Sequence, residues 1–276
     1  MKSTKNTIIP VAIHGVPRSG TTWIGEIINS SPCSIYKYQP LFSYKHKGFL
    51  TPESSTDRIN SFFELLTKCD DSFTGQTEQR LKGTLPRFKK KQISHIVYKE
   101  VRYHHILENL LQKTENLKLV LIIRNPLSVI NSWLKAPREF RNDLGWLVEE
   151  EWQYADKKNL KKPEEFYGYE RWKEATNLFL KLKAKSHDRV HIITYSQFLK
   201  SPKTETKKLF SFLDLSYSDQ TELFLQDSTI KMNKDPYSVY KSDQSDNSWI
   251  TELPSYIVEF IKSDLKGSEL EKFLDN

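Results

Sequence analysis

The chain has 276 residues, and with 28% charged and 37% hydrophobic residues it has the composition of a globular protein that buries a full core. Its net charge of +7 comes from 42 basic and 35 acidic residues, with no recognised nucleic-acid-binding motif, so it favours an anionic small ligand over nucleic acid as a partner. Because no linker, repeat or low-complexity tract interrupts the sequence, we expect a single domain over residues 1–276.

Two features bear on the compartment of the protein. Cys33 and Cys69 are the only cysteines, and two isolated cysteines in a chain of this length favour free thiols in a reducing compartment over a disulfide scaffold. The apolar run near the N-terminus spans about six residues, which is too short for a signal sequence or a membrane span. These features predict a cytoplasmic protein without a membrane span.

The first predicted elements are a strand over residues 8–13 and a helix behind it, joined by a glycine-bearing loop. Such a loop directs backbone N–H groups, together with the positive end of the helix, at one point where a phosphate fits. Gly15 and Gly20 have the spacing of the nucleotide-binding P-loop, but Thr21 stands where that motif requires lysine, and the basic residue is Arg18. We therefore expect the loop to bind a phosphate ester. The protein would contact the transferred group from a different direction than the lysine of a P-loop does. A strand, turn and helix without a ligand is the simpler alternative.

Residues 17–23, PRSGTTW, resemble the 5′-phosphosulfate-binding loop of the sulfotransferases that use 3′-phosphoadenylyl sulfate (PAPS). The resemblance implies a PAPS cofactor, adenosine 3′,5′-bisphosphate (PAP) as its product, and no metal. It also implies that Arg18 takes part in catalysis, because it would stabilise the 5′-phosphate as the leaving group. The residues that it assigns to cofactor binding in this loop are Arg18, Ser19, Gly20, Thr21, Thr22 and Trp23.

The next predicted strand, residues 33–38, leads into the string QPLF at residues 39–42. In many carbohydrate sulfotransferases the equivalent string is E-P-L, and its glutamate is regarded as the catalytic base. Gln39 departs from this pattern, because a glutamine side chain takes up no proton at neutral pH. We expect Gln39 to hydrogen-bond the acceptor substrate; a glutamine in a β-turn before proline is the alternative.

A predicted strand over residues 95–102 becomes polar at its end, where a parallel sheet presents its chemistry. This position favours Lys99, Glu100 and Arg102 as site residues over salt-bridged surface groups, and the string is similar to the K-x-x-R of several sulfotransferases. We expect Lys99 and Arg102 to bind the acceptor substrate. The catalytic base stays open between Glu100, the first candidate, and His104, the second.

A helix predicted over residues 103–113 precedes the most apolar strand of the sequence, residues 117–123. This strand ends in Arg124, and Ser132 follows eight positions later. The spacing resembles the 3′-phosphate-binding element of the same family, in which arginine offers a bidentate fork and serine a hydroxyl donor. A Walker-B strand would end in aspartate to hold Mg²⁺, so an arginine here indicates an anion rather than a metal.

The remaining elements are an aromatic and acidic stretch, three helices and one strand. In residues 135–171, helix packing is favoured over stacking of the aromatic rings on an acceptor. The predicted elements after it are a helix over 169–186, a strand over 190–194, a helix that ends near Leu213 and a closing helix over 256–265.

The resemblance extends to two further parts of the cofactor site. By this resemblance Tyr195, directly after the last predicted strand, lies near the adenine. Residues 226–249 are polar and predicted to form a loop. A basic loop covers the nucleotide at this point in the family, which assigns Lys241 and Ser242 to cofactor binding.

Together these patterns predict one α/β domain with a mostly parallel central sheet of about five strands, helices on both faces and a P-loop-like phosphosulfate loop. The resemblance implies transfer of a sulfuryl group from PAPS to an acceptor hydroxyl by in-line displacement. A carbohydrate or glycolipid hydroxyl is favoured, and a small hydroxylated metabolite or an amine stays open.

Two other functions stay open. A nucleoside or small-molecule kinase with a degenerate P-loop would need ATP and Mg²⁺, and the missing lysine and aspartate argue against it. A catalytically inactive nucleotide-binding module of the same fold is favoured by one feature, Gln39 in place of glutamate. Turnover with PAPS would separate such a module from an enzyme.

Overall fold

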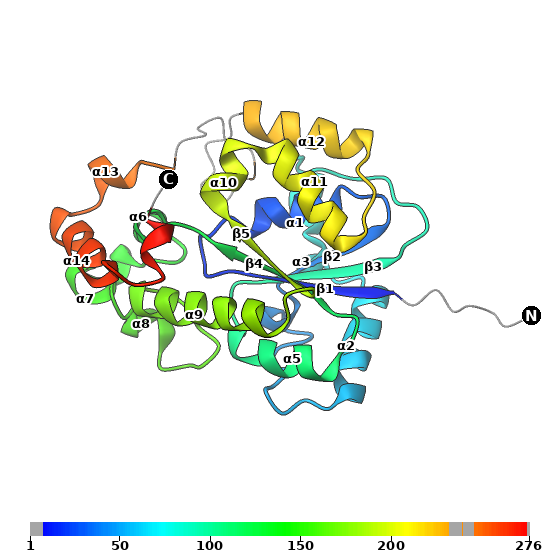
Figure 1. The fold of residues 1–276 in the computed structure, drawn as a ribbon, viewed down its shortest axis with the longest axis horizontal. Helices are drawn as coiled ribbons and strands as arrows, with labels where there is room; N and C mark the ends of the chain where they lie inside the picture. The colour runs from blue at the N-terminus through cyan, green and yellow to red at the C-terminus, as the bar shows by residue number, and fades with distance from the viewer. Residues whose placement is uncertain (1–7, 232–238, 240–245, 275–276) are drawn as a thin grey trace, which may run out of the picture.

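The computed structural model describes residues 8–231, residue 239 and residues 246–274. Its centre is a sheet of five strands, all parallel, in the order β2-β3-β1-β4-β5 (Figure 1). The strands are β1 (Ile9–His14), β2 (Ser34–Tyr38), β3 (His95–Glu100), β4 (Lys118–Ile123) and β5 (Val190–Thr194). Short, mostly apolar strands of this kind fit a sheet that is covered on both faces.

The strand order changes direction at β1, in the middle of the sheet. β1 pairs with β3 on one side, from Ile9 opposite His95 to His14 opposite Glu100, and with β4 on the other side. The carboxyl ends of β1, β3 and β4 therefore meet at one edge. In doubly wound α/β proteins, ligands bind in the crevice that forms at this edge.

Helices cover both faces of the sheet (Figure 1). On one face lie α1 (Thr21–Asn29), α10 (Tyr195–Lys200), α11 (Pro202–Leu213) and α12 (Asp219–Ile230), and on the other α2 (Thr56–Lys68), α5 (Leu107–Lys113) and α9 (Tyr169–Lys185). The other helices are α3 (Ser72–Gly75), α4 (Thr77–Leu81), α6 (Pro126–Leu134), α7 (Val148–Glu151), α8 (Asp156–Asn159), α13 (Trp249–Glu252) and α14 (Ser255–Leu265). Short 3₁₀ turns are formed by Pro40–Phe42, His104–Ile106, Asn142–Leu144 and Glu271–Phe273. Among the described residues, no helix has both the length and the apolar composition that a membrane span needs.

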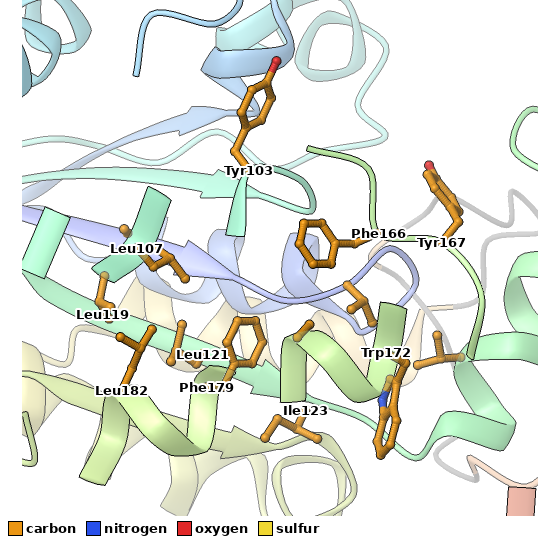
Figure 2. Packing of buried hydrophobic residues seen from close by; sticks show 14 of the residues in the cluster. Tyr103, Leu107, Leu119, Leu121, Ile123, Phe166, Tyr167, Trp172, Phe179 and Leu182 are labelled. Atoms are coloured by element: carbon orange, nitrogen blue, oxygen red, sulfur yellow. The ribbon is translucent and has the colours of Figure 1, made fainter. Parts of the chain in front are cut away.

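The alternation of side chains along the strands divides the core into two clusters, one on each face of the sheet. In β4, every second residue from Leu119 to Ile123 joins the cluster of α2, α5 and α9, and the two between them join the cluster of α1, α10 and α11. Figure 2 shows Leu119 and Leu121 on the side of the sheet that faces Phe179 and Leu182 of α9. Because both faces are filled, a ligand has access to the edge of the sheet and not to its faces.

Helix α6 shows how the sequence positions one part of this edge. Asn125 precedes the helix and accepts a hydrogen bond from the Leu127 amide at 2.9 Å. Pro126 occupies the first turn, where a missing N–H leaves no hydrogen bond unmade. The helix therefore begins directly after β4, and Arg124 stays at the tip of that strand.

The fold class predicted from the sequence is confirmed, and the predicted strands agree with the observed strands within two residues. The helix expected from Tyr103 was wrong at its start, because the observed helix begins at Leu107. Tyr103 has a left-handed backbone with φ of 58°, and His104–Ile106 forms a 3₁₀ turn. A left-handed residue interrupts the regular hydrogen bonding that an α-helix requires.

The loop expected from residue 226 was also wrong at its start, because α12 continues to Ile230. Ser228, in the last turn of this helix, is buried and accepts a hydrogen bond from the Trp23 indole at 3.0 Å. The contact with α1 stabilises a helical turn whose polar composition predicted a loop.

Candidate active site

The loop between β1 and α1 has the shape of an anion-binding nest. Arg18 and Gly20 both have left-handed backbone angles, with φ of 70° and 88°, and the Ser19 amide donates to the Val16 carbonyl oxygen at 3.2 Å. Helix α1 begins at Thr21, so the amides of its first turn have no acceptor one turn earlier in the helix. A concave run of N–H groups at the start of a helix binds phosphate-like anions.

Close packing holds this loop against its neighbours. A Cβ atom on Gly20 would lie 2.2 Å from the ring of Tyr195, and one on Gly15 would lie 2.9 Å from the Ile122 carbonyl oxygen of β4. The Ser19 hydroxyl is buried and has no hydrogen-bond partner among the described residues. A buried hydroxyl of this kind, next to the amides of the nest, fits an oxygen of a bound phosphate group.

Thr22 and Trp23 lie in the first turn of α1, with their amides in the nest. The Trp23 ring meets the rings of Tyr195 and Phe198 edge-on, with centroids 6.1 Å and 5.4 Å away. Trp23 therefore packs α1 against α10 through its side chain, and this packing fixes the start of the helix.

Direct contacts join the loop to the Arg124 element at the end of β4. The Arg124 guanidinium donates to the Arg18 carbonyl oxygen at 2.5 Å, and Arg18 Nε donates to the Ser132 hydroxyl at 3.0 Å. Arg124 also lies 5.0 Å from the ring centroid of Tyr195, the residue that follows β5. The structure thus brings together Arg18, Arg124, Ser132 and Tyr195, which were predicted from separate segments of the sequence.

Asp246 occupies the fork of Arg124. Its carboxylate accepts hydrogen bonds from Arg124 Nε at 3.0 Å and from Nη2 at 2.5 Å. Burial alone would lower the pKa of Arg124, but the charge and hydrogen bonds of Asp246 raise it above the ordinary value. Lys241 and Ser242, which the resemblance assigned to the cofactor, lie outside the described residues.

On the β2–β3 side of the loop, Gln39 and Arg102 form one hydrogen-bonded group. The Gln39 side-chain oxygen accepts from Arg102 at 3.0 Å, and Arg102 also pairs with Glu165 at 2.8 Å. The guanidinium lies 4.2 Å from the ring centroid of Phe42, which is 42% exposed. Gln39 has a left-handed backbone with φ of 41° and directly precedes a 3₁₀ turn.

Lys99 and Glu100, at the end of β3, are both buried. The Glu100 carboxylate is fully enclosed and accepts a hydrogen bond from the Leu41 amide at 2.7 Å, which holds the 3₁₀ turn after Gln39. The Lys99 ammonium lies 4.2 Å from the ring centroid of Tyr38. Burial raises the pKa of the Glu100 carboxyl and lowers that of the Lys99 ammonium.

His104, the second candidate base, lies in the hydrophobic core. It is fully buried, its Nδ1 is 3.0 Å from the Nδ1 of His14, and its ring centroid is 4.3 Å from that of Phe166 and 5.3 Å from that of Phe179. Burial lowers the pKa of His14 to about 3 and that of His104 well below its ordinary value. Enclosure by aromatic rings makes a structural role the better interpretation of His104.

Two acidic residues at this edge carried no signal in the sequence. Glu139 forms an ion pair with Arg18 at 3.7 Å, and Asp246 pairs with Arg124. Both lie in loops, and their positions depend on how distant segments pack rather than on spacing within a motif. The composition of residues 135–171 indicated packing and did not single out Glu139.

Neither cysteine forms a disulfide, since Cys33 and Cys69 are both free. Cys69 is buried, with its sulfur 3.5 Å from a ring nitrogen of His46. Within the described part of the chain, no group of three or more histidine, cysteine, aspartate or glutamate side chains is arranged to hold a metal ion.

Comparison with models of protein families identifies the family of this chain. A family model described as a sulfotransferase domain matches residues 9–263 of the chain. The chain belongs to the sulfotransferase family. The match covers all five strands of the sulfotransferase, the loop after β1 and the Arg124 element.

Solved structures that share the fold of this sulfotransferase are distant in sequence. The sulfotransferase domain of the olefin synthase from Synechococcus PCC 7002 is 14% identical, with 96% of this chain and 97% of that chain covered and a TM-score of 0.52. A sulfotransferase domain from the curacin biosynthetic pathway is 18% identical, with 94% and 97% covered and a TM-score of 0.54. The mouse sulfotransferase SULT7A1, solved in complex with PAP, is 15% identical, with 98% and 88% covered and a TM-score of 0.55. No curated protein matches the sequence.

Replacing Gly20 by alanine tests the packing of the loop. The added methyl group would meet the Tyr195 ring at 2.2 Å on a backbone with φ of 88°, so we expect the free energy of unfolding to fall by roughly 1–3 kcal/mol. Gly83→Ala is the matched control, because Gly83 also has a left-handed backbone but open space around it. Urea unfolding compares the two variants, and equal losses would contradict the contact between Tyr195 and the loop.

The buried pair of His14 and His104 makes stability depend on pH. Both stay neutral in the folded protein, whereas in the unfolded chain they take up protons below their ordinary pKa of 6.5. The unfolded state then binds more protons, so the free energy of unfolding falls as the pH drops below that value. Each histidine contributes a slope of up to about 1.4 kcal/mol per pH unit, and the contribution of His14 continues down to a pH of about 3.

Urea unfolding over a series of pH values measures this slope. His104→Gln keeps a hydrogen-bonding side chain but takes up no proton, so it is expected to reduce the slope. His187→Gln, at an exposed position, is the control for the loss of a histidine. A slope in His104→Gln equal to that of the unsubstituted protein would show that His104 does not contribute as a buried neutral group.

Proposed function

We propose that this sulfotransferase transfers a sulfuryl group from PAPS to an acceptor hydroxyl by in-line displacement. The observation that carries the proposal is the set of contacts that joins Arg124, Arg18 and Ser132, because it links an anion nest to a second basic element at the adjacent strand tip. PAPS carries two separate anionic groups, a 5′-phosphosulfate and a 3′-phosphate. Two linked anion-binding elements suit such a molecule better than a nucleotide with a single phosphate chain.

The nest would bind the 5′-phosphosulfate. The groups available there are the Arg18 guanidinium, the Ser19 hydroxyl and the backbone amides of Gly20, Thr21, Thr22 and Trp23. Sulfuryl transfer, like phosphoryl transfer, needs donor, transferred group and acceptor in line, and donors where charge develops on the leaving oxygen. Donors held in place by packing stabilise that charge without having to reorganise.

Arg124 and Ser132 would bind the 3′-phosphate, and Tyr195 beside Arg124 suits the adenine. The fork of Arg124 holds Asp246, so a 3′-phosphate would replace one bidentate anionic partner by another. This replacement gives cofactor selectivity, because a nucleotide without a 3′-phosphate has no group to exchange for the carboxylate.

Gln39, Lys99 and Arg102 would contact the acceptor. Gln39 follows β2, Lys99 lies near the end of β3 and Arg102 follows that strand, and their side chains can hydrogen-bond hydroxyl oxygens. The exposed ring of Phe42 beside Arg102 suits the apolar face of a sugar. These features favour a carbohydrate or glycolipid hydroxyl as acceptor, ahead of a small hydroxylated metabolite or an amine.

Calorimetric titration tests the cofactor, with PAP in the presence of EDTA, adenosine 5′-monophosphate, and ATP with Mg²⁺. We expect PAP to bind without metal, and the monophosphate to bind about tenfold more weakly or worse, because it lacks the 3′-phosphate contact. Binding of ATP only with Mg²⁺ would overturn the proposal in favour of a kinase. Transfer of labelled sulfuryl from PAPS to a panel of saccharides, glycolipids, phenols and amines then separates an enzyme from an inactive nucleotide-binding module.

Arg124→Ala and Asp246→Asn are expected to change the affinity for PAP in opposite directions. Loss of the guanidinium should weaken binding by roughly 1.5–3 kcal/mol, the value of a charge-assisted contact, whereas loss of the competing carboxylate should tighten it. Arg141→Ala removes an exposed arginine paired with Asp143 and controls for net charge. An unchanged dissociation constant in Arg124→Ala would exclude Arg124 from the cofactor site.

A further inference from the structure

A carboxylate from outside the two anion-binding elements lies beside the Arg18 side chain. Glu139, in the loop after α6, pairs with Arg18 at 3.7 Å between Oε1 and Nη1, and its side chain is 19% exposed. Its other oxygen, Oε2, is buried and has no hydrogen-bond partner within the described residues. A buried carboxylate oxygen without a partner is unfavourable for stability, so its position points to a ligand.

The backbone position of Glu139 is fixed by the residue that follows it. Phe140 is buried, with its ring centroid 5.4 Å from that of Trp133 in α6 and 5.9 Å from that of Trp146. The amides of Glu139 and Phe140 both donate to the Ala136 carbonyl oxygen at 2.8 Å. The loop is therefore anchored to α6, the helix that carries the proposed 3′-phosphate contact.

The charge of Glu139 acts on titratable groups from several other elements. Burial, followed by the charge of Glu139, raises the pKa of Tyr38 to about 12 and also raises that of Tyr167. The same charge acts on Lys99 and Lys158, in each of which burial lowers the pKa and Glu139 opposes the shift. Arg18 is the group in direct contact with Glu139, and the groups whose pKa values its charge affects are Tyr38, Lys99, Lys158 and Tyr167. The carboxylate therefore contacts the nest and acts electrostatically on the proposed acceptor side.

We propose that Glu139 is the catalytic base of the transfer, in the role that Gln39 cannot fill. This inference rests on the proposed function. Glu139 Oε2 accepts the proton of the acceptor hydroxyl while the acceptor oxygen forms its bond to sulfur. The bond between sulfur and the 5′-phosphate oxygen breaks, and its electron pair leaves on that oxygen, where Arg18 and the nest stabilise the charge.

The two bases considered from the sequence have surroundings that suit this role less well. Glu100 Oε2, like Glu139 Oε2, is buried without a hydrogen-bond partner among the described residues, but the Glu100 side chain is fully enclosed and its other oxygen holds the Leu41 amide, so its carboxylate supports the turn after β2. His104 lies between phenylalanine rings in the core. Glu139 differs from both, because it is partly exposed and in contact with the residue that would meet the leaving group.

The test compares Glu139→Gln with Asp143→Asn, which removes another arginine-paired carboxylate from the same loop. We expect Glu139→Gln to lose roughly 10²–10⁴-fold in turnover of labelled PAPS with an acceptor found in the panel, the contribution of a general base. The dissociation constant of PAP should stay the same or become smaller, because a negative charge next to Arg18 is removed. Asp143→Asn should retain both properties.

The pH profile separates a base from a residue that only supports the structure. Turnover of the unsubstituted enzyme should fall as the pH drops, because a protonated Glu139 accepts no proton from the acceptor. This acid limb should disappear in Glu139→Gln and persist, with part of the activity, in Glu139→Asp.

Two results would count against the inference in distinguishable ways. Turnover of Glu139→Gln within about threefold of the unsubstituted enzyme, with the acid limb retained, would overturn the role of Glu139 and leave PAPS-dependent transfer intact. Glu139 would then only neutralise Arg18. Binding of PAP without transfer to any acceptor of the panel would instead contradict the proposed function, and the role of Glu139 with it.

Discussion

The hydrogen bond from the Arg124 guanidinium to the Arg18 carbonyl oxygen connects the tip of β4 to the loop after the adjacent strand, β1. It is possible because β1 and β4 pair in parallel, so that both chains leave the sheet at the same edge. The contact fixes the separation between the nest after β1 and the basic element after β4. Under the proposed function, this fixed separation selects ligands by the distance between their two anionic groups, and it is set before any ligand binds.

The basic residues of this edge carry acidic partners. Asp246 fills the fork of Arg124, and Glu139 pairs with Arg18. A buried guanidinium without a partner would be strongly unfavourable, so these carboxylates stabilise the protein in the absence of a ligand. Under the proposed function, binding of PAPS is an exchange of carboxylate for phosphate at Arg124, and its affinity depends on the difference between the two partners.

The turn after β2 carries an amide, Gln39, and has a structural function. The Gln39 side chain accepts a hydrogen bond from Arg102, and the Glu100 carboxylate accepts one from the Leu41 amide in the same turn. Under our inference the catalytic base lies instead in the loop after α6, where Phe140 anchors Glu139.

Local order in the sequence was enough to predict the five strands and the left-handed loop that carries Arg18 and Gly20. Each of these depends on residue types at short spacing along one segment, since apolar runs form strands and glycines allow left-handed turns. The enclosure of Glu100, the burial of His104 in the core and the positions of Glu139 and Asp246 followed only from the tertiary structure. Burial and ion pairing are decided by which distant segments pack against the edge of the sheet, and no spacing within a single segment encodes that choice.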